Sequence, residues 1–429
     1  MKLKAILVGC GDRASVYANF AVNEFKEVEI VAAVDPDEER RRLVHQLFNV
    51  PLEKTYSDIS GVLSQGKIAD FVINGTMDHL HVSTSIPFLK QGYDMLLEKP
   101  ITNNEKELLE LVKTAKENKC KLMICHVLRF SPFYREIKKT ILSGEIGEVI
   151  NIDTSERVGA YHSSVSYLRG KWNSEKECGS SLLLAKCCHD IDLIAWFNNE
   201  TRPVLTYSEG ERNYFNEDNA PKGCGNRCMV DCPKEIKDKC LYDAEYMYIK
   251  NDLLPWYPWQ CTGKNYKDLS LEEKINSLKT DNPHGRCVFK CGGDLLNHQH
   301  VVIRFANGSS ASHTLVLGAM KADRTIYVLG TKGEIEGSVS SGKLFIRTFN
   351  KETSGYNERA VNFTETEGET GGHFGGDKGL VKDFLSYLKD DKPSISTTVL
   401  EDSLISHLVI YDADKSVQKG EPVIFNHKI

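Results

Sequence analysis

The chain has 429 residues, of which 41% are hydrophobic and 27% charged, and its formal net charge is −6. One hydrophobic core rarely organises so long a chain, so we expect two domains. Acidic and basic side chains are interspersed, which argues against nucleic acid or a membrane surface as a partner. The apolar run near the N-terminus is too short for a signal sequence, and no stretch is long enough to span a membrane. We therefore expect a soluble, cytoplasmic protein.

The first part of the chain alternates between two hydrophobic periods, as βαβ units do. Continuous apolar runs predict buried parallel strands, and the amphipathic stretches between them predict crossover helices. Strands are expected at 4–9, 29–35, 69–74, 94–98 and 121–125, and helices include 37–48 and 104–118. With right-handed crossovers, this pattern predicts a doubly wound Rossmann domain over residues 1–125.

A glycine-rich turn follows the first predicted strand and opens a helix. Gly9, Gly11 and Ala14 form the pattern G-x-G-x-x-A. The first glycine permits a tight turn, the second lets the backbone approach a pyrophosphate, and the small third residue lets helix and strand pack closely. A glycine-rich turn without a ligand is the alternative, but the preceding strand and the following helix favour a dinucleotide site.

An acidic residue, Asp35, ends the second predicted strand. A carboxylate at this place accepts hydrogen bonds from the adenosine ribose and repels a 2′-phosphate, which favours NAD over NADP. NADP stays open as a cofactor because Arg13 or the arginines at 40–42 could reach a phosphate.

The tripeptide Glu98-Lys99-Pro100 closes a later strand, and the carboxyl ends of parallel strands face the ligand crevice. A lysine beside a nicotinamide can donate a hydrogen bond to a substrate hydroxyl and stabilise the alkoxide that develops as hydride leaves. The neighbouring Glu98 could orient that lysine. For the tripeptide alone, a solvated strand end is the simpler interpretation.

From about residue 147 the pattern changes to short strands separated by turn signals. Strands are expected at 149–156, 299–305, 310–316, 324–330, 333–338 and 343–348, and helices at 377–389 and 400–419. Asp377 is the expected N-cap of the first of these helices. These elements predict an α+β domain over residues 126–429 with a large, open, mostly antiparallel sheet. Residues 208–298 lack this rhythm and are interpreted as a cysteine-rich insertion.

Lys186, His189 and Asp192 are spaced at intervals of three, which places them on one stripe of a predicted helix. The other faces of that helix are apolar. A lone histidine on such a helix is usually a core residue, but three ionisable groups on one stripe are costly unless they line a polar cleft. We therefore expect the stripe to face the site.

Together these motifs resemble the Gfo/Idh/MocA oxidoreductases, named after glucose–fructose oxidoreductase, inositol dehydrogenase and MocA. The resemblance also rests on CHVLRFSPFYREIKKTILSGEIGEV, KCCHDIDLIAW and HFGGDKGLVKDFLSYL. It implies that Lys99 and His189 flank the substrate carbon facing the nicotinamide. The family commonly has an aspartate where this chain has Ala185, and we expect Lys186 to replace it as a third catalytic residue. The cofactor-binding residues then expected are Gly9, Gly11, Asp12, Arg13, Ala14, Asp35, Thr76, His81, Glu98 and Lys99.

The segment at 161–172 is rich in hydrogen-bond donors and aromatic rings, as polyol recognition requires. Its place in the family pattern assigns His162, Arg169 and Trp172 to substrate contact, and Asp192 joins them from the helix stripe. A surface loop without substrate contact is the alternative for this segment.

The expected activity is hydride transfer between NAD, or NADP, and a secondary hydroxyl of a sugar, glycoside or cyclitol. Two alternatives stay open: glycoside cleavage through transiently reduced NAD, and a dinucleotide sensor without catalysis. The open sheet invites pairing of copies, so a homodimer or homotetramer is expected.

Thirteen cysteines are present, and ten of them lie between Cys178 and Cys291. In a reducing compartment they are metal ligands, reactive thiols or buried side chains rather than a disulfide framework. The insertion lacks periodic apolar residues, so a structural metal would supply energy to order it. The predicted ligands are Cys228, Cys232, Cys240 and Cys287, with zinc first and an iron–sulfur cluster second. Packed, reduced cysteines without metal are the alternative.

Overall fold

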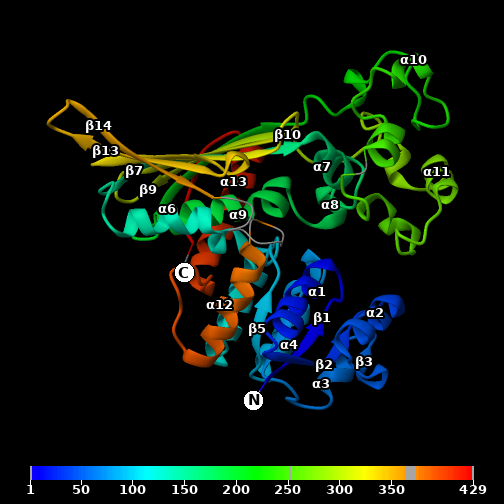
Figure 1. The fold of residues 1–429 in the computed structure, drawn as a ribbon, viewed down its shortest axis with the longest axis horizontal. Coiled ribbons are helices and arrows are strands. Elements are labelled where there is room, and N and C mark those ends of the chain that lie inside the picture. The colour runs from blue at the N-terminus through cyan, green and yellow to red at the C-terminus, as the bar shows by residue number, and fades with distance from the viewer. Residues whose placement is uncertain (1, 252, 364–372, 374, 428–429) are drawn as a thin grey trace.

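Two β-sheets organise the chain in the computed structural model, which describes residues 2–251, 253–363, 373 and 375–427. Figure 1 shows the N-terminal sheet and its helices on one side of the molecule and a broad, curved sheet on the other. Helices α6 and α9 lie between the two sheets in this view. None of the described helices is long and apolar enough to cross a membrane.

The first sheet has six parallel strands in the order β3-β2-β1-β4-β5-β6, which confirms the doubly wound Rossmann prediction. Its strands are β1 Leu3–Val8, β2 Val28–Val34, β3 Thr55–Tyr56, β4 Phe71–Asn74, β5 Asp94–Leu97 and β6 Leu122–Ile124. The helices of this part are α1 Asp12–Asn19, α2 Glu38–Phe48, α3 Ser60–Leu63, α4 His81–Lys90 and α5 Glu105–Glu117. The sequence pattern missed β3 because two residues are too few to show a period.

A helix from the far end of the chain, α12 Gly376–Asp390, completes the core of this first sheet. Its Phe384 meets Phe71 of β4 edge to face, with ring centroids 5.3 Å apart. The expected N-cap was wrong, because Gly375 caps the helix with φ of 77° and Asp377 lies in the first turn. The carboxylate of Asp377, 1% exposed, is thereby free to point inward.

The second sheet has nine strands in the order β14-β13-β12-β11-β7-β10-β9-β8-β15. All its pairs are antiparallel except β7 with β10, which confirms the mostly antiparallel prediction. The strands are β7 Val149–Gly159, β8 Pro203–Glu211, β9 His298–Phe305, β10 Ser310–Ala319, β11 Asp323–Gly330, β12 Gly333–Ser338, β13 Lys343–Asn350, β14 Gly355–Asn362 and β15 Val423–Ile424. The helices of this part are α6 Pro132–Leu142, α7 Ala160–His162, α8 Glu175–Cys178, α9 Leu182–Phe197 and α13 Leu400–Lys419.

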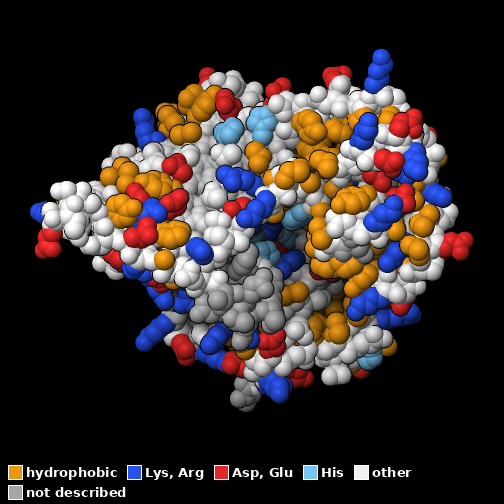
Figure 2. Space-filling model, turned by 45° about the horizontal axis from the view of Figure 1, so that its top comes forward, with side chains coloured by type: hydrophobic (Ala, Val, Ile, Leu, Met, Phe, Trp, Pro, Cys, Tyr) orange, Lys and Arg blue, Asp and Glu red, His pale blue; other side chains and the backbone are white. Residues whose placement is uncertain are grey.

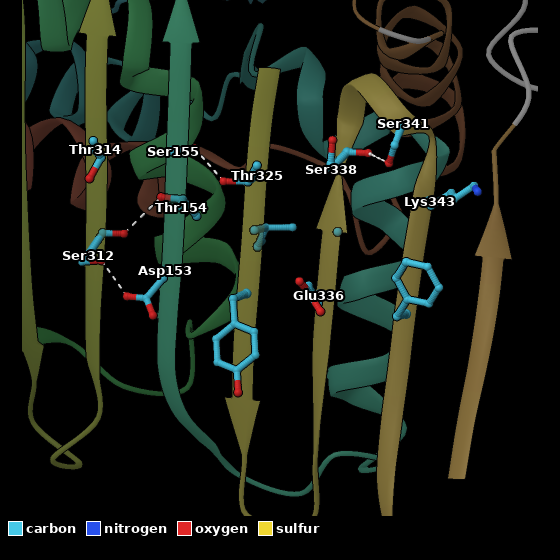
Figure 3. Close-up of a pocket in the computed structure, with 14 residues that line it drawn as sticks. Asp153, Thr154, Ser155, Ser312, Thr314, Thr325, Glu336, Ser338, Ser341 and Lys343 are labelled. Atoms are coloured by element: carbon cyan, nitrogen blue, oxygen red, sulfur yellow. Dashed lines mark hydrogen bonds between the residues drawn. The ribbon is translucent and has the colours of Figure 1, made fainter. Parts of the chain in front are cut away.

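One face of the second sheet packs on helices and the other is open. Strand β9 shows this directly, since buried residues alternate with exposed ones along most of its length. The open face carries a broad hollow lined mainly by short polar side chains of β7 and β10–β13, such as Asp153, Ser312 and Thr325 (Figure 3). On β7, Glu156 points the opposite way, towards α9, as the alternation of a strand requires. The hollow is therefore on the far side of the sheet from α9.

The cysteine-rich insertion connects β8 to β9, and Figure 1 shows it beyond one end of the second sheet. Because β8 continues to Glu211 and β9 begins at His298, the insertion comprises residues 212–297, a few residues fewer than expected. It contains the helices α10 Lys234–Lys237 and α11 Leu271–Lys279. It also has its own aromatic core, in which Phe215 packs against Tyr242 and Phe289. The expectation that the insertion has little apolar ordering energy was wrong, because its aromatic residues are too irregularly spaced to show a period.

Candidate active site

The glycine-rich turn between β1 and α1 has the geometry that each of its small residues was expected to provide. Gly9 has φ of +77°, and a Cβ there would lie 2.6 Å from the backbone nitrogen of Thr76. A Cβ on Gly75 would lie 2.8 Å from that of Ala14, so the helix packs tightly on this side. At Gly11, by contrast, no atom of the described residues other than its own and those of its two chain neighbours lies within 4 Å of the Cβ position. The N-terminus of α1 is thus open where a pyrophosphate would approach it, and a dinucleotide fits these residues.

Asp35 is fixed beside this turn. Its carboxylate is 3% exposed and accepts hydrogen bonds from the backbone N–H groups of Cys10, at 2.8 Å, and Asp37, at 2.9 Å. The half-exposed guanidinium of Arg40 lies 3.8 Å from the same carboxylate. The acidic group expected to meet the ribose is therefore at the predicted place, with one arginine next to it.

Arg13, which was expected to contact the cofactor, joins α1 to β5 and α12. Its guanidinium contacts Glu98 at 3.0 Å and Asp377 at 2.5 Å. Tyr17 donates to the same oxygen of Glu98 at 2.6 Å. Burial would raise the pKa of Glu98, but Arg13 and Lys99 outweigh it and hold that pKa below its ordinary value. Arg13 is thus held by two carboxylates, and Arg40 is the arginine better placed for a 2′-phosphate.

Two further residues expected at the cofactor, Thr76 and His81, hold the loops around the crevice. The Thr76 hydroxyl donates to the side chain of Asn74 at 2.9 Å. The buried ring of His81 lies between two carbonyl oxygens, 2.6 Å from that of Pro100 and 3.1 Å from that of Thr76. These contacts connect the end of β4 to the end of β5.

The insertion reaches the glycine-rich turn. The amide of Gln260, in the short 3₁₀ helix Tyr257–Thr262, donates to the exposed carboxylate of Asp12 at 3.1 Å. Asp12 is the first residue of α1. A segment about 250 positions later in the sequence therefore covers part of the dinucleotide crevice.

Lys99 connects the two domains at the predicted centre. Its ammonium donates to the backbone carbonyl of Ala185 on α9 at 3.1 Å. The carbonyl of Ala185 is about one helical turn ahead of His189, so the two predicted catalytic residues are neighbours. Among the residues that the structure describes, no carboxylate lies within ion-pair distance of this ammonium. Within the described structure, the ammonium of Lys99 is therefore hydrogen-bonded to a neutral carbonyl group and not to an anion.

His189 is 4% exposed, and its Nδ1 has no hydrogen-bond partner within the described part of the chain. The rings of His126 and His373 lie 5.7 Å and 5.8 Å from its own, measured between centroids. Burial, followed by the positive charge of Lys99, lowers the pKa of His189 well below its ordinary value. The imidazole is therefore neutral at pH 7 and able to accept a proton.

Lys186 takes part in an ionic network beside His189. Its ammonium lies 3.2 Å from Glu156 of β7, and Arg324 of β11 contacts the other oxygen of Glu156 at 2.7 Å. Arg324 also contacts Asp190 at 3.0 Å. Burial, followed by the charge of Lys186, lowers the pKa of His162 well below its ordinary value.

Asp192 does not face the cleft with the rest of the stripe. It is fully buried, and Arg129 binds its carboxylate through two hydrogen bonds of 2.7 Å each. This geometry makes the substrate contact expected of Asp192 untenable and assigns it to the packing of α9.

Arg169 likewise points away from the cleft. It is 1% exposed, and its guanidinium donates to the carbonyl oxygens of Arg286, at 2.6 Å, and Tyr242, at 2.7 Å. The substrate contact expected of Arg169 is incompatible with this burial, because its donors are directed into the insertion.

Trp172 belongs to an aromatic row that runs from the end of β7 to the insertion. Successive ring centroids of His162, Tyr167, Trp172 and Tyr257 lie 5.7, 6.4 and 6.5 Å apart. The Lys171 ammonium lies 4.2 Å from the centroid of a Trp172 ring. Figure 2 shows a hollow in the centre of one face, with histidine and basic side chains inside it and hydrophobic side chains along one rim.

Sequence reasoning missed several residues of this cleft. No role was expected for His373 of the HFGGDKG motif, whose Nδ1 lies 3.2 Å from Asp377. His373 precedes α12, which begins at Gly376, so helical spacing gave no signal for this pair. Glu156 and Arg324 lie in predicted strands, and no local pattern shows that they pair with each other and with Lys186.

Five cysteines of the insertion line one small cavity: Cys224, Cys228, Cys232, Cys240 and Cys287. The four predicted ligands are among them, and Cys224, a candidate from its spacing that was not one of the four, is the fifth. The sulfur atoms of Cys224 and Cys287 are 4.0 Å apart. Among the described residues, Cys187, Asp190 and His313 alone bring three possible ligand atoms within 4.8 Å of one another. That group lies in the core beside Arg324, whose charge already balances Asp190.

Comparison with known proteins assigns the family. Residues 3–126 match the Gfo/Idh/MocA model described as an oxidoreductase family with an NAD-binding Rossmann fold. Residues 138–246 match the model of the same family's C-terminal alpha/beta domain. The chain belongs to the Gfo/Idh/MocA oxidoreductase family. Both the resemblance and the two-part architecture are thereby confirmed.

Individual relatives are distant. The oxidoreductase YteT of Bacillus subtilis is 25% identical over 372 residues, covering 83% of this chain and 82% of its own length. An inositol 2-dehydrogenase of Corynebacterium glutamicum is 24% identical over 195 residues, covering 45% of this chain and 53% of its own. Levoglucosan dehydrogenase in complex with NADH has the same fold, with a TM-score of 0.71, 16% identity and full coverage of both chains. The family is one of NAD(P)-dependent oxidoreductases, and two of these relatives are named as dehydrogenases of inositol and of levoglucosan.

Proposed function

We propose that this protein is an NAD-dependent dehydrogenase that oxidises a secondary hydroxyl of a sugar, glycoside or cyclitol. The observation that carries the proposal is the pair formed by Lys99 and His189. The ammonium of Lys99, which has no carboxylate partner among the described residues, lies beside the neutral, buried imidazole of His189, at the edge of the parallel sheet next to the glycine-rich turn. A sensor of dinucleotides needs neither group.

The reaction removes a proton and a hydride from the substrate. Bound NAD supplies the nicotinamide that accepts the hydride. The neutral His189 takes the hydroxyl proton as general base, and the Lys99 ammonium donates a hydrogen bond to the oxygen as it becomes an alkoxide. Lys186, held by Glu156, orients the substrate through a neighbouring hydroxyl. The open space above Gly11 admits the pyrophosphate, and Asp35 accepts from the ribose.

A polyhydroxylated substrate matches the remaining walls of the cleft. His162 and Trp172 offer an imidazole and an indole, and aromatic faces suit the C–H faces of a sugar ring. Two of the relatives are named for an inositol and an anhydrosugar, which agrees with this class.

We also propose that copies of the chain pair through the open face of the nine-stranded sheet as a homodimer or homotetramer. On this face the apolar side chain of Val302 is 45% exposed among polar neighbours. An unpartnered sheet face of this breadth is typical of an interface. Sedimentation velocity on the protein with and without Val302→Glu tests it, and a monomer in both would contradict it.

A substrate screen tests the proposed activity. The protein is incubated with NAD, or NADP, and single sugars, glycosides and cyclitols, while NADH absorbance is followed. We expect at least one compound to give NADH in proportion to ketone formed. Product without accumulated NADH would replace this proposal by glycoside cleavage with transient reduction. NAD binding without turnover of any compound would favour the sensor.

A further inference from the structure

The five cysteines around the cavity of the insertion are the strongest feature that the proposed reaction does not use. They come from two stretches of chain, with Cys287 far in sequence from the other four, and none is in a disulfide. The cavity has a volume of about 10 Å³. A single water molecule needs about 10–15 Å³ measured in this way, so the cavity has room for one small ion.

Backbone contacts hold the two stretches together independently of any ion. The N–H of Cys228 donates to the carbonyl of Gly285 at 3.0 Å, and that of Cys287 donates to Asn226 at 2.8 Å. Arg227 and Arg286 form an isolated antiparallel bridge between them. This frame presents the thiols of Cys228 and Cys287 to the same cavity.

The separation of two sulfur atoms matches a metal site better than a disulfide. The sulfurs of Cys224 and Cys287 are 4.0 Å apart. A tetrahedral zinc site with Zn–S bonds of about 2.3 Å has sulfur–sulfur edges of about 3.8 Å, whereas a disulfide bond is about 2.05 Å long. No three of the five sulfurs lie within 4.8 Å of one another, so the side chains would turn inward as an ion binds.

A buried cation beside the cavity lacks a counter-charge. Arg169 donates to carbonyl oxygens, to hydroxyls and, at 3.5 Å, to the sulfur of Cys228. No carboxylate in the described part of the chain lies within ion-pair distance of it. A buried charge without an opposite charge is costly, and a zinc ion with four thiolates carries a formal charge of about −2.

We propose that this cavity binds one zinc ion through four of its five cysteine thiolates, with Cys228 and Cys287 among the ligands, and that Arg169 balances the charge of the site. Thiolate ligands favour zinc, and a multi-iron cluster would need more room than the cavity offers. The site is structural, because four thiolates leave no open position for a substrate.

Zinc content of the full chain tests the proposal. Protein expressed with zinc in the medium and purified without chelator should contain about one zinc per chain by elemental analysis. Cys228→Ser and Cys287→Ser should each lose it. Cys261→Ser is the matched control, because Cys261 is an exposed thiol of the same insertion outside the cavity, and it should keep the zinc. Cobalt(II) in place of zinc should give the charge-transfer and d–d absorption of a tetrahedral thiolate site.

A count of reactive thiols in the wild-type protein tests the proposal even if a serine variant does not fold. Extraction of zinc from the wild-type protein should make about four additional thiols reactive towards a colorimetric disulfide reagent. Three results would each overturn the proposal. They are wild-type protein that contains no zinc, protein that contains iron with acid-labile sulfide, and a Cys224–Cys287 disulfide in the mass spectrum. None of these readouts depends on dehydrogenase activity.

Discussion

Replacing Lys99 by methionine tests the proposed chemistry most directly. Methionine keeps an unbranched chain of similar length but removes the ammonium. Because Lys99 contacts a carbonyl and no carboxylate in the described structure, the change leaves no buried anion unpaired. The lost hydrogen bond to Ala185 costs about 1 kcal/mol of folding stability. NAD affinity should stay nearly unchanged, since the pyrophosphate and ribose sites lie at Gly11 and Asp35.

Two kinetic effects of different kinds are expected from this change. Loss of a donor to a developing oxyanion costs about 3–4 kcal/mol, or roughly a 100- to 1,000-fold lower kcat. Lys99 also lowers the pKa of His189, after burial. Without that charge the pKa rises, so His189 is protonated and inactive as a base up to a higher pH. The acid limb of the kcat/KM profile should therefore move to higher pH.

Steady-state NADH formation between about pH 5 and 9 measures both effects. Lys99→Arg is the control: it keeps the charge, so the acid limb should stay in place although turnover falls. Thermal unfolding and NAD titration of each variant exclude a folding defect. Near-wild-type turnover of Lys99→Met on the true substrate, or an unmoved acid limb, would refute the reasoning.

Three further predictions concern carboxylates. Asp35→Ala should weaken NAD binding about 10- to 100-fold and raise the affinity for NADP relative to NAD, because Arg40 remains beside the ribose site. Titration of wild type and variant with both cofactors measures this change. An unchanged preference for NAD over NADP would contradict the assignment of Asp35 to the ribose. Asp192→Ala should lower the free energy of unfolding, measured in urea, by about 3–5 kcal/mol, because Arg129 loses a buried partner. A higher KM with unchanged stability would instead show that Asp192 contacts the substrate. Burial raises the pKa of Asp414 from 3.8 to about 7. The folded state therefore favours the neutral acid, and stability from this group is present below about pH 4 and is lost as pH rises through 7. Relative to wild type, Asp414→Asn should thus gain about 4 kcal/mol of unfolding free energy in urea between pH 4 and 8. A difference that stays constant across that range would exclude this titration.

The Rossmann part of the fold was predictable because its signals are local. Each buried strand is a continuous apolar run, and the roles of Gly9 and Ala14 depend on neighbours fixed by the strand–turn–helix geometry. Lys99 and His189 came from motifs whose positions on a strand end and a helix could be placed without a structure. Their contact through Ala185 agrees with that placement.

The sequence could not predict contacts between residues that are far apart in the chain. The stripe of α9 predicted a polar face, but whether Asp192 meets solvent or Arg129 is decided by a residue on another element. Arg169 lies in a segment rich in donors, and its burial follows from the insertion that closes over it. Helical or strand periodicity contains no information on such pairs.

The insertion is an enlarged hairpin loop between β8 and β9. Glu211 and His298 face each other as the last pair of β8 and β9, so its two ends stand side by side. A turn of about two to five residues normally closes such a pair of strands. A short turn in place of residues 212–297 would keep this strand pair, but it would expose Arg169, which donates to carbonyl oxygens of the insertion. The contact of Gln260 with Asp12 would leave with the insertion, and the crevice would open to larger or polymeric molecules.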